Sequence, residues 1–77
     1  MIKIDLKSNK PIYKQVVNEI KEDVIKEFLN PGDELPSVRK LAMDLSVIPN
    51  TVAKAYQELE RLKIIETIRD KGTYISA

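Results

Sequence analysis

The 77-residue sequence contains no cysteine, no histidine and no tryptophan, and it has only two glycines. Without cysteine there is no disulfide framework to stabilise so short a chain. The joint absence of cysteine and histidine removes the usual zinc ligands and the common nucleophile–base pairs of enzymes. Gly72 is isolated, so no glycine-rich phosphate loop is present. We therefore expect no catalysis, no metal and no cofactor.

Long apolar runs are also missing. The first residues, Met1 to Lys7, alternate apolar and charged side chains, whereas a signal peptide needs an unbroken apolar stretch. No run elsewhere approaches the length of a membrane span. These absences predict a cytoplasmic protein that has no membrane partner.

The composition suits one small soluble domain spanning residues 1–77, with 43% apolar and 32% charged residues. The net charge of +1 is distributed unevenly. Residues 1–35 carry six lysines and seven acids, whereas residues 36–77 carry seven basic residues and five acids. This weak basic bias permits a phosphate-binding surface without demonstrating one.

The N-terminal half predicts a strand and a long helix. In residues 1–10, Ile2, Ile4 and Leu6 alternate with charged residues, which indicates a short, half-buried strand in an N-terminal arm. Pro11 is suited to open a helix over residues 11–29, and the sequence at 30–33 ends it. Apolar residues recur every four positions along that helix and form a stripe that Tyr13, Val17 and Ile25 widen. The residues of the four-residue series are Ile12, Val16, Ile20, Val24 and Phe28.

Two shorter helices follow, over residues 37–45 and 49–62. The Ser37 hydroxyl is placed to cap the first of them, and Pro49 opens the second. Each has one apolar stripe, so two helices with so short a connection must cross and share a core. The stripes comprise Val38, Leu41, Ala42 and Leu45 in the first helix and Val52, Ala55, Tyr56, Leu59 and Leu62 in the second.

Residues 64–76 change to a β pattern. Two segments rich in β-branched residues flank a turn at residues 70–72, which predicts a β-hairpin. The fold class expected from this order is mainly α with a β-hairpin: a winged helix-turn-helix of three helices plus a wing.

Two motifs resemble catalytic ones. Ser37 and Lys40 fit the S-x-x-K pattern of serine acyl-enzymes, but so small a domain can scarcely build the pocket and oxyanion hole that this chemistry needs. Glu19 and Asp23 share a helix face, where a solvated charged surface explains them better than an acid–base pair. We interpret Ser37 as a helix cap and expect no enzyme.

The helix-turn-helix interpretation depends on spacing and on exposed polar residues. Ala42, Ser46 and Val52 occupy the small, turn and buried-aliphatic positions of such a motif, although any helical hairpin can show this spacing. Asn50 and Thr51 begin the exposed face of the third helix, with Lys54 one turn further on. Such side chains can meet base edges or phosphates in a major groove, while Asn50 or Thr51 can also serve as a cap.

The hairpin tip carries Arg69, Asp70, Lys71 and Gly72. Cations beside a glycine could lie along a minor groove, although a bare hairpin turn has the same composition. By itself the tip therefore leaves both interpretations open.

From Pro11 to Ile75 the chain resembles the DNA-binding domain of the GntR family of bacterial transcription regulators, in particular its YtrA-like branch. The matching motifs are Pro11-Ile12-Tyr13 with Gln15, Pro31-Gly32-Asp33, Leu35-Pro36-Ser37-Val38-Arg39 with Leu41-Ala42, Pro49-Asn50-Thr51-Val52, Ala55-Tyr56, Leu59-Glu60 and Lys71-Gly72-Thr73. The resemblance implies a regulator, expected to be a repressor, that binds a palindromic operator in double-stranded DNA as a homodimer in its full-length form.

The resemblance also implies a set of DNA contacts, with the third helix in the major groove and the wing tip at the minor groove. The expected DNA-binding residues are Ser37, Arg39, Asn50, Thr51, Lys54, Arg69, Lys71 and Gly72. The sequence does not identify an effector. The alternative function is that of a winged helix that binds another protein, because the fold does not fix the function.

Four residues depart from the family pattern. Ile48 stands where a polar helix cap is usual, and Ser46, Lys63 and Asp70 stand where glycine is frequent. Asp70 also places an acid beside the expected phosphate contacts of the wing. These departures concern the wing's role and the DNA sequence preference rather than the fold.

Overall fold

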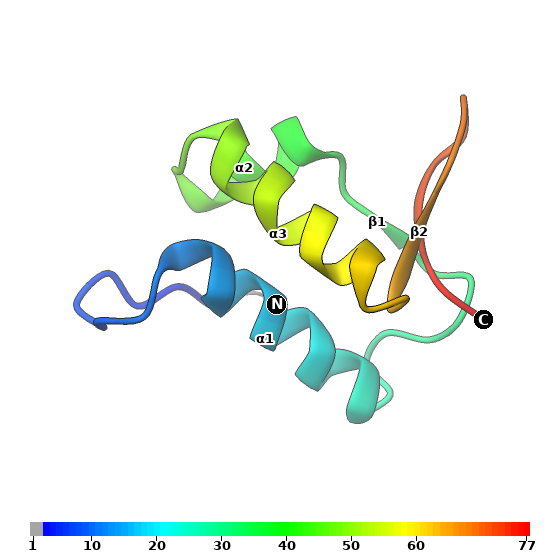
Figure 1. Ribbon diagram of the computed structural model, residues 1–77, viewed down its shortest axis with the longest axis horizontal. Helices are drawn as coiled ribbons and strands as arrows, with labels where there is room; N and C mark the ends of the chain where they lie inside the picture. The colour runs from blue at the N-terminus through cyan, green and yellow to red at the C-terminus, as the bar shows by residue number, and fades with distance from the viewer. Residues whose placement is uncertain (1–2) are drawn as a thin grey trace.

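The computed structural model describes residues 3–77 and confirms the predicted fold class, with three helices and a small antiparallel sheet at one end (Figure 1). Among these residues, no helix has the length and apolar character needed to cross a bilayer. The elements are α1 (Ile12–Ile25), β1 (Glu34–Leu35), α2 (Val38–Leu45), α3 (Pro49–Arg61), β2 (Ile65–Ile68) and β3 (Gly72–Ile75).

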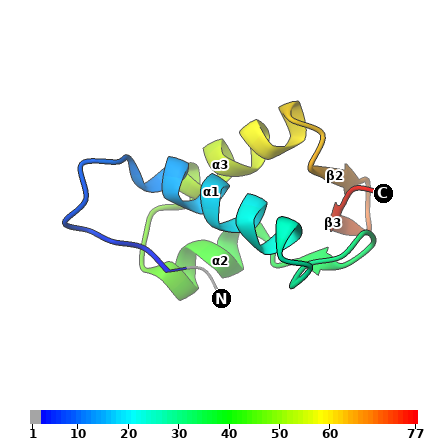
Figure 2. The same cartoon turned by 90° about the horizontal axis from the view of Figure 1, so that it is seen from below.

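The core lies between α1, α2, α3 and the base of the sheet. Figures 1 and 2 show α3 beside both α1 and α2, and the inward stripes of the three helices meet there. Burial of these apolar stripes is the main force that holds helices this short in place. The buried residues are Val16, Val17, Ile20, Leu35, Leu41, Ala42, Val52, Ala55, Tyr56, Leu59, Ile65 and Ile75.

The sheet has the order β1–β3–β2, with both pairings antiparallel. The hairpin pairs Ile65 with Ile75 and Ile68 with Gly72, so its base enters the core and its tip extends outward. No pattern in the sequence predicted β1, in which Leu35 pairs with Thr73. A two-residue strand is too short for its alternation to be recognised, and only its pairing with β3 defines it.

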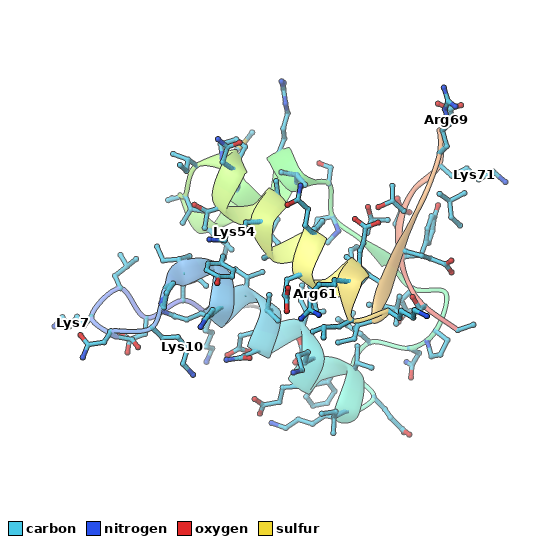
Figure 3. All side chains as sticks on the ribbon, viewed as in Figure 1. Lys7, Lys10, Lys54, Arg61, Arg69 and Lys71 are labelled. Carbon is cyan, nitrogen blue, oxygen red and sulfur yellow. The ribbon has the colours of Figure 1, made fainter. Side chains whose placement is uncertain are left out.

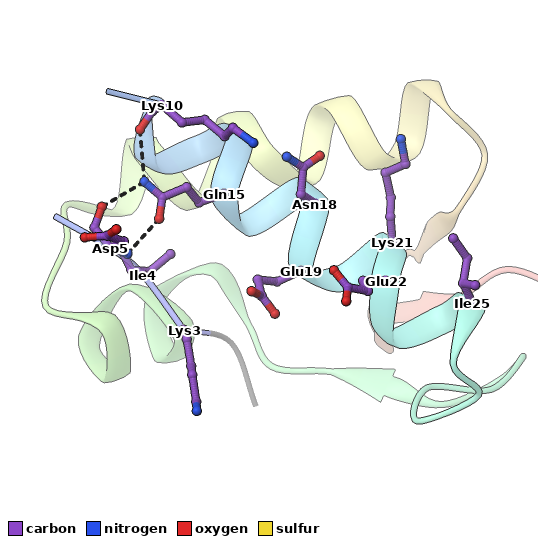
Figure 4. A pocket seen from close by; sticks show the side chains of 10 residues that line it. All are labelled: Lys3, Ile4, Asp5, Lys10, Gln15, Asn18, Glu19, Lys21, Glu22 and Ile25. Carbon is purple, nitrogen blue, oxygen red and sulfur yellow. Dashed lines mark hydrogen bonds between the residues drawn. The ribbon is translucent and has the colours of Figure 1, made fainter. Parts of the chain in front are cut away.

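The predicted N-terminal strand is wrong for the residues that the structure describes, and Ile2 lies outside them. Residues 3–10 form an irregular segment with turns and pair with no strand in the described chain. The Gln15 side chain ties this segment to α1: its Oε1 accepts from the Asp5 amide at 2.7 Å, and its Nε2 donates to the Asp5 and Lys10 carbonyls (Figure 4). Side-chain hydrogen bonds thus take the place of a strand ladder.

The first helix ends at Ile25, earlier than the predicted residue 29. The amide of Phe28 donates to the Asp23 carbonyl at 2.8 Å, and Glu27 adopts a left-handed conformation with φ of 63°. The chain therefore leaves the helix before Phe28, whose side chain is 71% exposed, and Leu29 packs against the core instead. The four-residue apolar spacing predicted the helix correctly as far as Val24, but Phe28, the next residue of the series, lies outside the helix.

All three helices end in the same way. Each is followed by a left-handed residue that is not glycine: Glu27, Ser46 and Lys63, with φ of 63°, 56° and 62°. After α3, the amides of Lys63 and Ile64 donate to the Glu60 and Leu59 carbonyls, both at 2.9 Å. This is the hydrogen-bond pattern of a Schellman motif, in which glycine is the usual left-handed residue.

Candidate nucleic-acid interface

The connection between α2 and α3 forms a tight corner. The amide of Val47 donates to the Ala42 carbonyl at 3.0 Å, which closes the end of α2. The buried Tyr56 hydroxyl of α3 donates to the Pro36 carbonyl, just before α2, at 2.7 Å. Burial raises the pKa of Tyr56 to about 12, so the hydroxyl keeps its proton at neutral pH. The start of α2 is therefore fixed against α3.

Ser37 and Arg39 lie at the start of α2. The Ser37 hydroxyl accepts a hydrogen bond from the Lys40 amide at 3.1 Å, which makes it the predicted N-cap. Arg39 is exposed on the first turn of α2. It borders a groove of about 400 Å³ that extends to the first residue of α3; the other lining residues are Ala42, Met43, Val47 and Pro49.

Asn50, Thr51 and Lys54 lie on the first turns of α3. The N-cap of this helix is Ile48, whose side chain makes no capping hydrogen bond. Within residues 3–77, the side chains of Asn50 and Thr51 form no hydrogen bond that would make either of them the cap. All three residues line a second groove, of about 390 Å³, together with Pro11, Ile12 and Tyr13 at the start of α1. The polar side chains are thus available to a ligand approaching the N-terminus of α3.

The wing tip lies away from both grooves. Figure 3 shows Arg69 and Lys71 at the outer end of the hairpin, where both are exposed. Asp70 has a left-handed φ of 65°, and the Lys71 amide donates to the Ile68 carbonyl at 3.0 Å to close the turn. Gly72 has a φ of 138°, which side chains rarely permit. The turn therefore needs glycine at position 72, whereas aspartate can adopt the left-handed conformation at position 70.

The ion pairs of the described chain lie outside the predicted site. They are Lys26–Glu22, Lys40–Asp44 and Arg61–Glu58. The hydrogen bond from Lys26 lowers the pKa of Glu22, and that from Arg61 lowers the pKa of Glu58. In contrast, the site cations form no ion pair with any residue in 3–77; they are Arg39, Lys54, Arg69 and Lys71. No carboxylate of the described residues is within ion-pair distance of these cations, which leaves them free to contact phosphates.

Two residues beside the predicted site, Tyr13 and Glu34, were not expected there from the sequence. The Lys54 ammonium lies 4.1 Å from the centre of the Tyr13 ring, although Tyr13 was interpreted as part of an apolar stripe and of a family motif, not as a neighbour of Lys54. A Glu34 carboxylate oxygen lies 3.0 Å from where a Cβ on Gly72 would stand. Both contacts join segments that are distant in the sequence, so no local pattern indicates them.

The chain belongs to the GntR family of bacterial regulatory proteins, whose family model matches residues 12–75. The HTH-type transcriptional repressor YtrA of Bacillus subtilis (strain 168) is 57% identical over 76 residues, which cover 99% of this chain and 58% of that protein. The chain thus spans less than two thirds of the length of this relative.

Two solved structures have the same fold. YtrA of Sulfolobus acidocaldarius, a GntR-family transcription factor, superposes with a TM-score of 0.92 at 43% identity, covering 99% of this chain and 80% of that one. The DNA-binding domain of AraR in complex with operator ORX1 gives a TM-score of 0.86 at 20% identity, covering 97% of this chain and 96% of that one. The likeness to AraR concerns the fold alone.

Proposed function

We propose that this chain is the sequence-specific DNA-binding part of a cytoplasmic transcriptional repressor, with no catalytic role. The first turns of α3 enter the major groove of double-stranded DNA, and the wing tip lies at the minor groove. The full-length protein binds a palindromic operator as a homodimer, so that its two copies of α3 meet successive major grooves about 34 Å apart.

The observation that carries this proposal is the placement of polar and cationic side chains on a winged helix. Asn50 and Thr51 are on the first turn of α3, where short side chains reach base edges. Arg39 borders the groove at the helix corner and supplies a planar guanidinium for a guanine edge or a phosphate. Arg69 and Lys71 stand at the end of the projecting hairpin without a carboxylate partner in residues 3–77.

Two candidates remain, of which Ser37 acts through its side-chain hydroxyl and Gly72 through its backbone. The Ser37 hydroxyl accepts the capping bond and retains its own proton, which can be donated to a phosphate. Gly72 supplies the positive-φ backbone of the turn that presents the wing tip to the minor groove. The names of two relatives agree with this function, since YtrA of Bacillus subtilis is a transcriptional repressor and YtrA of Sulfolobus acidocaldarius is a transcription factor.

A binding assay over a range of salt concentrations tests the proposal. The duplex is one that the chain itself retains from a random-sequence pool. Phosphate contacts from Lys54, Arg69 and Lys71 give a slope of log affinity against log salt of about −2.7, and a fourth from Arg39 would make it about −3.6. A chain that retains no duplex, or one whose binding ignores salt, would contradict DNA binding and favour a winged helix that binds protein.

Arg39→Ala tests the site itself. If the guanidinium meets a guanine edge, the variant loses about 1–3 kcal/mol of binding free energy. Lys26→Ala is the matched control, because it removes the same charge from the far end of α1, where Lys26 pairs with Glu22. We expect Lys26→Ala to bind as the wild type does. Equal losses in both variants would show that only net charge matters and would remove Arg39 from the site.

A further inference from the structure

Lys54 is held by an aromatic ring rather than by a carboxylate. Its ammonium nitrogen lies 4.1 Å from the centre of the Tyr13 ring, and Lys54 forms no ion pair within residues 3–77. The negative face of an aromatic ring attracts a cation through its quadrupole. Unlike a carboxylate, the ring leaves the positive charge of the lysine uncancelled.

Tyr13 is well placed to act as a fixed platform. It is half-buried and packs against the core on the first turn of α1. The next turn contributes Val16 and Val17 to the core, and α1 packs along α3. Lys54, in contrast, is exposed, and a flexible four-carbon side chain carries its ammonium group (Figure 3). The contact therefore restricts the lysine and leaves the tyrosine unchanged.

The same contact aims Lys54 toward the predicted DNA-binding residues. Tyr13 and Lys54 line one groove of about 390 Å³ together with Asn50 and Thr51. A lysine that is already ordered in this groove loses less conformational entropy when it meets a phosphate than one that moves freely in water.

We propose that Tyr13 is a positioning residue for DNA binding, which holds the Lys54 ammonium beside Asn50 and Thr51 for contact with a backbone phosphate. This inference rests on the proposed function. Tyr13 acts through Lys54, so the ring face matters and the tyrosine hydroxyl does not.

The strength of an exposed cation–π contact sets the expected effect. Removal of the ring weakens binding by about two- to five-fold. Tyr13→Leu and Tyr13→Met both remove the ring, and methionine fills the space with an unbranched, adaptable side chain. Tyr13→Phe keeps the ring face and is expected to retain the wild-type affinity.

A double-mutant cycle with Lys54→Ala tests the proposal. The probe is a labelled duplex that the wild-type chain retains from a random-sequence pool, and thermal melts confirm that each variant is folded. Tyr13→Leu and Tyr13→Met should weaken binding when Lys54 is present and have no effect when residue 54 is alanine. Lys54→Ala should reduce the salt slope by about one, whereas Tyr13→Leu should preserve it because the charge remains.

Three results would overturn the inference. An equal loss in both backgrounds would mean that Tyr13 acts through the fold or through its own DNA contact. A loss in Tyr13→Phe as large as in Tyr13→Leu would assign the effect to the hydroxyl. Wild-type affinity in both ring-free variants would show that the ring does not position Lys54. If the wild-type chain retained no duplex at all, the proposed function would fail, and this inference with it.

Discussion

Replacing Lys63 by glycine should stabilise the protein. Lys63 follows α3 in a left-handed conformation with φ of 62°, and its amide and that of Ile64 close the helix end. A left-handed conformation costs a residue with a Cβ about 1–2 kcal/mol. Glycine removes that cost but adds about 0.5–1 kcal/mol of chain entropy to the unfolded state. The net gain in the free energy of unfolding is about 0.5–1 kcal/mol.

For a domain of this size that gain raises the melting temperature by about 2–8 °C. Differential scanning calorimetry at neutral pH measures the change. Lys63→Ala is the control, because it removes the same charge from the end of α3 but retains the Cβ. A melting temperature of Lys63→Gly no higher than that of Lys63→Ala would refute the prediction, since relief of the left-handed conformation should exceed the entropy that glycine adds to the unfolded chain.

Three further predictions concern Ile48 at the start of α3, the buried Tyr56 and the oligomeric state of the chain. Ile48→Asn should raise the free energy of unfolding by about 1 kcal/mol, because Ile48 is an N-cap whose side chain is 66% exposed and makes no capping bond. Thermal melts measure the change, and a lower melting temperature would mean that the packing of Ile48 outweighs the missing cap. Tyr56→Phe should destabilise the fold by about 1 kcal/mol, because it loses the hydrogen bond to Pro36. Burial raises the pKa of Tyr56 to about 12 from an unfolded value of about 10, so its contribution to stability is complete below pH 10 and is lost toward pH 12. Over that range the melting temperature should fall more steeply for the wild type than for Tyr56→Phe. Parallel curves for the two proteins would contradict this. The 77-residue chain should be mainly monomeric in dilute solution, which sedimentation measures, and a tight dimer of the unfused chain would refute this. Fusion to a dimerising coiled coil should tighten binding to a palindromic duplex by about 10²- to 10⁴-fold in gel shifts, because tethering raises the effective concentration of the second copy.

The sequence predicted those elements that one apolar stripe defines. The stripes from Leu41 to Leu45 and from Val52 to Leu59 are short, regular and bounded by Pro49, so α2 and α3 lie where they were expected. The hairpin follows from its β-branched residues and from the turn before Gly72.

What the sequence failed to predict depends on contacts between distant segments. The alternation of Ile4 and Leu6 indicated a strand, but within residues 3–77 no strand pairs with this segment, and Gln15 binds it instead. Leu35 became a strand residue only because β3 passes beside it. In the site, the residues at the start of α3 were predictable from their position, whereas the Tyr13 ring beside Lys54 required the packing of α1 on α3.

Backbone amide chemical shifts, recorded while the chain is titrated with its selected duplex at physiological salt, test the central claim most directly. The proposed interface predicts the largest changes at residues 37–39, 50–54 and 69–72, the starts of α2 and α3 and the tip of the wing. Changes confined to the C-terminal half of α1 and the turn that follows it, where Ile25 and Phe28 are exposed, would contradict the proposed interface.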